Sequence, residues 1–153
     1  MKKYLLLVAA FLFFSSAGAI TTPPKRLISE ATDWQAEATD AHSNNLPVMV
    51  VFISDSCPYC DRLKSDFLEP LIQDGKLVGL VHINQFHIKS GGKVVDFDGD
   101  QVRSRIFVDR YKIYATPTVV LLDYNGNQLT PPIIGFNNAD DYKSYLTEAI
   151  EDA

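Results

Sequence analysis

Cysteine is scarce in this chain of 153 residues: there are only two, both in the run Cys57-Pro58-Tyr59-Cys60. Two cysteines cannot form the network of disulfides that stabilises many small secreted domains. No cysteine or histidine pair elsewhere has zinc-ligand spacing, so a structural zinc site with four ligands is disfavoured. A static disulfide that closes so short a loop would stabilise the fold little. The spacing therefore indicates a dithiol that opens and closes in redox chemistry.

Positive charge is also in short supply, with 14 Lys and Arg against 19 Asp and Glu and a net charge of −5. Nucleic-acid binding needs clustered basic residues, so we do not expect nucleic acid as a partner. A chain of this length forms one domain that can bury a core without further cross-links, and we expect a monomer. Dithiol chemistry requires no metal or cofactor, and we expect neither.

The chain has one long apolar run, from Tyr4 to Phe14. Met1-Lys2-Lys3 precedes this run and small residues follow it, which is the order of a secretory signal peptide. The run is shorter than the roughly 20 residues that a membrane-spanning helix needs. Ala17 and Ala19 fit the rule for cleavage after small residues. We therefore predict a periplasmic protein with a signal peptide at 1–19, a spacer at 20–26 and a domain at 27–153.

Hydrophobic periodicity predicts an α/β domain in which helices alternate with short buried strands. Pro70 should break the second helix, so the residues up to Asp74 are expected to form a separate short helix. Asp100 is expected to cap the helix that follows a loop at 85–99. The predicted helices lie at 27–42, 58–69, 70–74, 101–111 and 139–150. The predicted strands lie at 48–53, 79–84, 119–122 and 128–134.

The cysteine pair falls where the strand at 48–53 passes into a helix. Pro58 suits the first helical position, which makes Cys57 the N-cap and Cys60 the third residue of the helix. The positive helix end lowers the pKa of a thiol at the N-cap. Cys60, one turn further on, should be more buried. We therefore predict that Cys57 attacks a disulfide and that Cys60 resolves the mixed disulfide.

A βαβ unit that carries Cys-x-x-Cys, followed by a ββα unit that begins Ala115-Thr116-Pro117-Thr118, resembles the thioredoxin superfamily. The resemblance implies a thioredoxin fold with a mixed four-stranded sheet flanked by helices and with an extra N-terminal helix. It also implies that Pro117 is cis and that the Thr116 backbone pairs with an extended substrate. Pro58 and Tyr59 would then line the substrate-binding rim.

Within the superfamily, the segments at 95–99 and 114–118 look most like the SoxW-like exported thioredoxins. Glutaredoxins share the Cys-Pro-Tyr-Cys tetrapeptide, but the signal peptide argues against the cytosolic ones. DsbA-type oxidases insert a helical domain where this chain has only the loop at 85–99. DsbC-type isomerases carry a dimerisation domain that this chain lacks.

Val51 departs from the pattern of the superfamily. Thioredoxins commonly place a buried carboxylate six residues before the first cysteine, where it helps to move the proton of the second, and Val51 occupies that position. His82 on the neighbouring strand is a candidate for proton transfer, although we favour the simpler interpretation of a strand-edge histidine bonded to backbone or water. Asp55 and Asp61 are further candidates, or solvated charges near the site.

These observations predict an exported thiol-disulfide oxidoreductase that reduces disulfides of exported proteins through Cys57 and Cys60. The resemblance implies recycling by a membrane thiol donor of the DsbD or CcdA type. Two alternatives remain open at this stage. The same dithiol could donate its disulfide as a DsbA-like oxidase. It could also bind Cu(I) through both thiolates as a chaperone, although no histidine lies close in sequence and the nearest methionine, Met49, falls in the buried strand.

Overall fold

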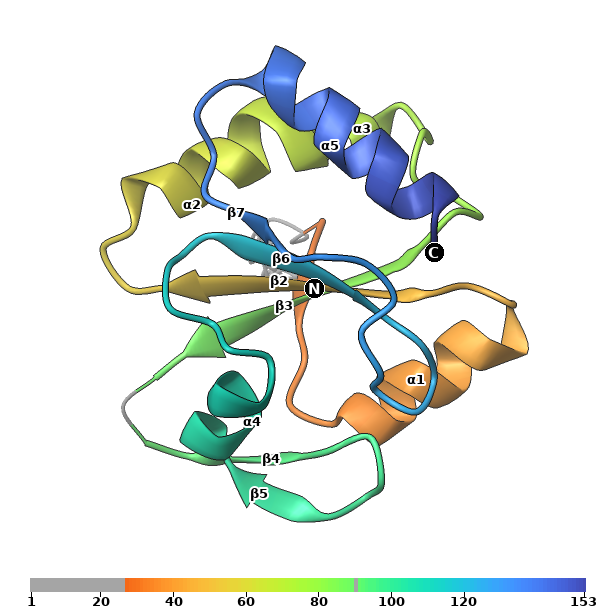
Figure 1. The fold of residues 1–153 in the computed structure, drawn as a ribbon, viewed down its shortest axis with the longest axis vertical. Coiled ribbons are helices and arrows are strands. Elements are labelled where there is room, and N and C mark those ends of the chain that lie inside the picture. The colour runs from red at the N-terminus through yellow and green to blue at the C-terminus, as the bar shows by residue number, and fades with distance from the viewer. Residues whose placement is uncertain (1–26, 90) are drawn as a thin grey trace, which may run out of the picture.

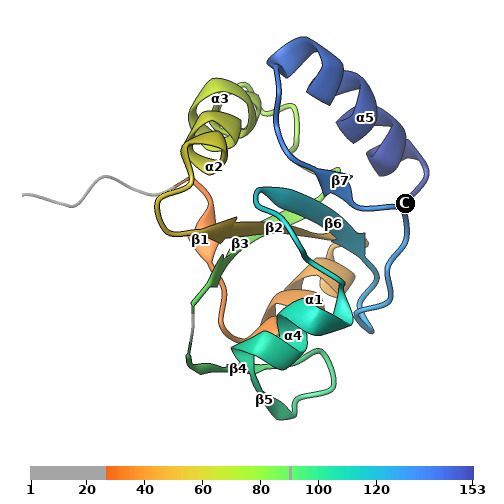
Figure 2. The same ribbon diagram turned by 60° about the vertical axis from the view of Figure 1, so that its left-hand side comes forward.

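The computed structural model describes residues 27–89 and 91–153, so the predicted signal peptide and spacer lie outside the described residues. Its core is a five-stranded sheet in the order β1-β3-β2-β6-β7 (Figures 1 and 2). The strands of this sheet are β1 (Ser29–Glu30), β2 (Val48–Ser54), β3 (His82–Ile88), β6 (Thr118–Leu122) and β7 (Ile133–Ile134). A separate hairpin consists of β4 (Lys93–Val95) and β5 (Gln101–Arg103). The helices are α1 (Trp34–Ser43), α2 (Pro58–Arg62), η1 (Leu63–Leu68), α3 (Glu69–Gln73), α4 (Ser104–Arg110) and α5 (Ala139–Glu151).

The sheet is mixed, as predicted: β3 runs parallel to β2, whereas β6 runs antiparallel to β2. The order of elements confirms the thioredoxin-like fold, with one strand more than the four predicted. The additional strand, β1, pairs parallel with β3 and takes up residues that we had predicted as helix. Helix α1 begins only at Trp34, because the Asp33 carboxylate caps it by accepting from the Ala36 N–H at 2.9 Å.

Two boundaries in the middle of the chain differ from the prediction. Strand β3 occupies His82–Ile88 rather than 79–84, and the predicted loop at 85–99 contains most of β3 and all of β4. The polar side chain of Gln85 is buried in this strand, so hydropathy alone missed the half of the strand that follows Asn84. Asp100 does not cap a helix, because Gln101–Arg103 forms β5 and α4 starts at Ser104.

The helix after the cysteines does not break at Pro70. Helices α2, η1 and α3 follow one another without a gap, and η1 is a turn of π-helix. The Glu69 N–H bonds the Lys64 carbonyl, five residues back rather than four. Because Pro70 has no N–H to donate, a wider turn just before it lets the helix continue past the proline.

The sheet has a hydrophobic core on each face. Alternate residues of β2 divide between the two, with Val51 and Ile53 in the cluster that contains Cys60 and with Phe52 in the cluster around Trp34. Helices α2, α3 and α5 cover the first face, and α1 and α4 cover the second (Figures 1 and 2). Within residues 27–89 and 91–153, no helix has the length and apolar character needed to cross a membrane.

Candidate active site

The two cysteines form a disulfide at the start of α2. Cys57 is the N-cap and Pro58 occupies the first turn, as predicted. The Cys60 N–H points at Cys57 Sγ at 3.2 Å, so the sulfur fills the place of a capping oxygen. Cys60 is buried, with 2% of its surface exposed, whereas Cys57 is half-buried. The helix end thus leaves Cys57 accessible from outside and keeps Cys60 buried behind it.

A second loop, about 60 residues further along the chain, completes the site. The Thr116-Pro117 peptide bond is cis, and Thr116 Oγ1 lies 3.6 Å from Cys57 Sγ. Thr116 Oγ1 also lies 2.7 Å from the hydroxyl of Ser54, the last residue of β2. The Gly135 N–H donates to the Pro117 carbonyl at 2.8 Å, which fixes the loop against the turn after β7. Ser54 was not among the predicted site residues, because only the tertiary fold brings it beside Thr116.

Exposed aromatic side chains occur in or just before the two segments that form the site. Tyr59, between the cysteines, is 56% exposed, and Tyr114, two residues before Thr116, is 87% exposed. Exposed tyrosines can pack against a partner chain while their hydroxyls remain in water. Tyr114 was not predicted as a site residue, although its position just before the Thr-Pro element could have indicated it.

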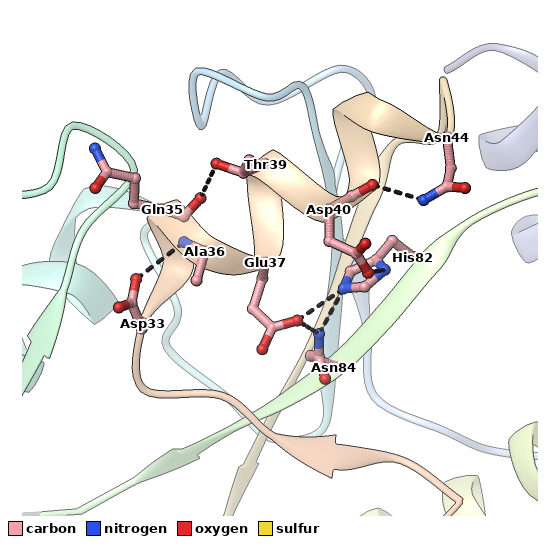
Figure 3. Close-up of polar contacts among 9 residues, drawn as sticks. All are labelled: Asp33, Gln35, Ala36, Glu37, Thr39, Asp40, Asn44, His82 and Asn84. Carbon is pink, nitrogen blue, oxygen red and sulfur yellow. Dashed lines mark hydrogen bonds and ion pairs between the residues drawn. The ribbon is translucent and has the colours of Figure 1, made fainter.

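The structure does not bring His82 to the cysteines. His82 starts β3 and pairs in register with Val48, whereas the cysteines follow Ser54 at the opposite end of β2. Six residues of strand separate the two ends by roughly 20 Å. The His82 Nε2 instead lies 2.7 Å from Glu37 Oε2 of α1, and Asn84 bonds the same carboxylate (Figure 3). The proposed role of His82 in proton transfer is therefore wrong, because this polar cluster ties α1 to β3 far from the site.

A different histidine lies near the cysteines. His87 pairs in register with Ile53, and its Nε2 lies 3.1 Å from Asp55 Oδ1, two residues before Cys57. Val51, at the position of the usual carboxylate, is fully buried and pairs with Gln85. The polar groups on this side of the sheet thus come from β3.

Asp61 lies on the exposed surface of the helix, where its carboxylate is 3.7 Å from Lys64 Nζ. Within residues 27–89 and 91–153, no group of three or more His, Cys, Asp or Glu side chains is arranged to hold a metal ion.

Comparison with known proteins shows the family. A thioredoxin-like domain model matches residues 34–150, and the chain belongs to the thioredoxin-like family. The fold and the Cys57–Cys60 disulfide together define a thiol-disulfide oxidoreductase. A search of curated protein sequences found no match.

Solved structures share the fold at low sequence identity. The oxidised C-terminal domain of DsbD from Neisseria meningitidis is 16% identical over 74% of this chain and 90% of that domain, with a TM-score of 0.53. Mitochondrial thioredoxin 3 from Saccharomyces cerevisiae is 21% identical over 82% of this chain and 95% of its own, with a TM-score of 0.51. The oxidoreductase DsbH is 18% identical over 90% of this chain and 95% of its own, with a TM-score of 0.51.

Proposed function

We propose that this protein is an exported reductase of protein disulfides that resembles the SoxW-like thioredoxins. The observation that carries the proposal is the capped cysteine: Cys57 Sγ accepts from the Cys60 N–H at a helix start and faces the Thr116 hydroxyl. Both groups, together with the positive helix end, stabilise negative charge on sulfur. Cys57 is also the more accessible of the two cysteines, which suits it to the first attack.

The reaction proceeds by two exchanges. The Cys57 thiolate attacks one sulfur of a substrate disulfide, and the other substrate sulfur leaves as a thiolate that takes up a proton. Cys60 then loses its proton and attacks Cys57 Sγ, which breaks the mixed disulfide and releases the first substrate sulfur. Two electrons pass to the substrate, and the Cys57–Cys60 disulfide forms. The backbone beside Pro117 holds the substrate chain during both steps.

Variants of the two cysteines test this scheme. The protein should accelerate the reduction of insulin by dithiothreitol, and Cys57→Ser should abolish this acceleration, because no thiolate remains at the helix start. When Cys60→Ser is mixed with a substrate in its disulfide form, a mixed disulfide between Cys57 and the substrate should accumulate. Full multiple-turnover activity of Cys60→Ser would contradict the two-thiol scheme.

The direction of electron flow is a matter of reduction potential. Equilibration with glutathione should give a value close to that of thioredoxin, near −270 mV, rather than the value of about −120 mV of DsbA. A DsbA-like value would instead make the protein a disulfide donor. Tight stoichiometric binding of Cu(I) by the reduced protein would favour the thiol chaperone.

Export provides the setting for this chemistry. The N-terminal pattern of basic, apolar and small residues supports a periplasmic location. An oxidised dithiol outside the cytosol needs a source of electrons across the membrane, which a thiol donor of the DsbD or CcdA type supplies. Loss of that donor should leave Cys57 and Cys60 oxidised in cells, which alkylation of extracts with a mass-tagged maleimide would reveal.

A further inference from the structure

A basic cavity lies beside the loop that follows β3. Its volume is about 720 Å³, within the range of ligand-binding cavities. Its charged and apolar walls consist of Lys89, Lys93, Arg103, Arg105, Ile88 and Val108. No acidic side chain is among the described residues that line it. In a chain of net charge −5, this is a local concentration of positive charge.

The positive side chains around this cavity repel one another in the protein without a ligand. Lys93 and Arg103 lie directly opposite each other in the antiparallel pair of β4 and β5. Like charges in opposite positions of neighbouring strands repel one another. Over the part of the chain that the structure describes, neither Arg103 nor Arg105 has an ion-pair partner. An anion between these side chains would relieve the repulsion.

The other two cations already have partners. Lys89 Nζ lies 2.9 Å from Glu30 Oε1, and Lys93 Nζ lies 3.4 Å from Gln101 Oε1. The guanidinium groups of the two arginines are therefore the ones available to an anionic ligand, and a guanidinium binds a carboxylate with two parallel hydrogen bonds.

The backbone around the cavity is fixed by hydrogen bonds. The Ser104 N–H donates to the Gly92 carbonyl at 3.1 Å, which ties the glycine loop to the start of α4. Gly92 has φ 111°, a conformation that side chains rarely allow. The Val95 N–H donates to the Thr32 carbonyl at 2.9 Å and holds the hairpin against the segment before α1. The cavity is thus largely formed before a ligand arrives.

We propose that this basic cavity binds an acidic segment of a partner protein that carries an apolar side chain among its carboxylates. Charge complementarity selects the carboxylates, which pair with Arg103 and Arg105, and the apolar side chain packs between Ile88 and Val108. Ile88 also pairs in register with Ser54, the residue that bonds Thr116 beside the disulfide. Ile88 lines the cavity, and Ser54 lies three residues before Cys57, so the cavity and the disulfide lie at the same end of the sheet. In Figure 1 the end of β3 and the start of α2 are found at this end. This inference goes beyond the proposed function and does not depend on it.

The test uses a synthetic peptide with four glutamates around one leucine. Titration into the ¹⁵N-labelled protein should shift the amide resonances of Gly91 and Gly92. The double variant Arg103→Glu, Arg105→Glu should weaken binding by about tenfold or more, because each new carboxylate repels the peptide. A peptide with alanine in place of leucine should bind more weakly, since the apolar contact is lost.

The matched control reverses two cations elsewhere, Lys76→Glu with Lys143→Glu, and should leave the affinity unchanged. Equal weakening by both double variants would overturn the proposal, because net charge rather than the cavity would then bind the peptide. Absence of peptide binding would overturn the proposal as well. It would also be overturned if the protein bound anionic phospholipid vesicles through Arg103 and Arg105 but did not bind the peptide. Reduction of a small aromatic disulfide should be unaffected in the Arg103 and Arg105 variant, so the redox proposal is tested separately.

Discussion

Replacing Thr116 by valine removes a hydroxyl 3.6 Å from Cys57 Sγ and keeps the shape of the side chain. In the reduced protein this hydroxyl is placed to donate to the Cys57 thiolate, and a hydrogen bond to a charged group contributes about 1.5–3 kcal/mol. The distance is long and Cys57 is only half-buried, so we expect the lower end of that range. A loss of about 1.5 kcal/mol corresponds to a thiolate population slightly more than tenfold smaller at pH values below the titration midpoint.

The pH dependence of alkylation by iodoacetamide measures this population. In a Cys60→Ser background only Cys57 reacts, and Thr116→Val should shift the rate profile to higher pH. Ser54→Ala should shift it in the same direction by less, because Ser54 acts on the sulfur only through the Thr116 hydroxyl. Thr130→Val is the matched control, since the buried Thr130 hydroxyl has no partner among the described residues. An unchanged profile for Thr116→Val would refute the reasoning.

Burial raises the pKa of Tyr142, and its hydroxyl has no hydrogen-bond partner among the described residues. Because an unpartnered buried hydroxyl costs free energy, Tyr142→Phe should leave the free energy of unfolding unchanged or raise it by up to about 1 kcal/mol. Tyr111→Phe should lower the free energy of unfolding by about 1 kcal/mol, because the 3.0 Å hydrogen bond from its hydroxyl to the Gly126 carbonyl is lost. Urea denaturation measures both variants, and equal effects would contradict this contrast. Partial burial raises the pKa of Asp123, but hydrogen bonds from Asn127 and its neighbours more than offset this, so that the pKa lies below its ordinary value. The stability that Asp123 contributes is therefore complete above about pH 4 and is lost as the pH falls through the lowered folded-state pKa. Asp123→Ala should make the free energy of unfolding depend less on pH in this range. An unchanged pH dependence would contradict this role of Asp123.

Elements with local signals could be predicted from the sequence. The apolar run of β2 and the periodic pattern of α5 appear where they were expected, and Pro58 marks the start of α2. Strand β3 was predicted to end at Asn84, because the next residue, Gln85, is polar and is buried only through its neighbours. Hydropathy registers the solvent preference of a residue and not the hydrogen bonds that the fold provides.

The short strands were harder to predict for a different reason. Strand β1 has two residues, and its extended conformation depends on pairing with β3 rather than on any preference of its own. The β4–β5 hairpin likewise falls in a stretch that reads as a loop. Pairing partners distant in sequence decide such segments, so a single sequence gives little indication of them.

The candidate site likewise has one part that local sequence predicts and another part that depends on strand pairing. Its central part, the capped cysteine with the buried one behind it, follows from four consecutive residues and could be predicted with its geometry. The groups around it come from strand register. His87 lies near the cysteines because β3 is paired with β2 along seven residues, and a prediction based on the misplaced strand put His82 there instead. A shift of a few residues in one strand thus moves a polar side chain from one end of the sheet to the other. Because Val51 leaves its own position apolar, the polar groups on this face are those that the register of β3 supplies.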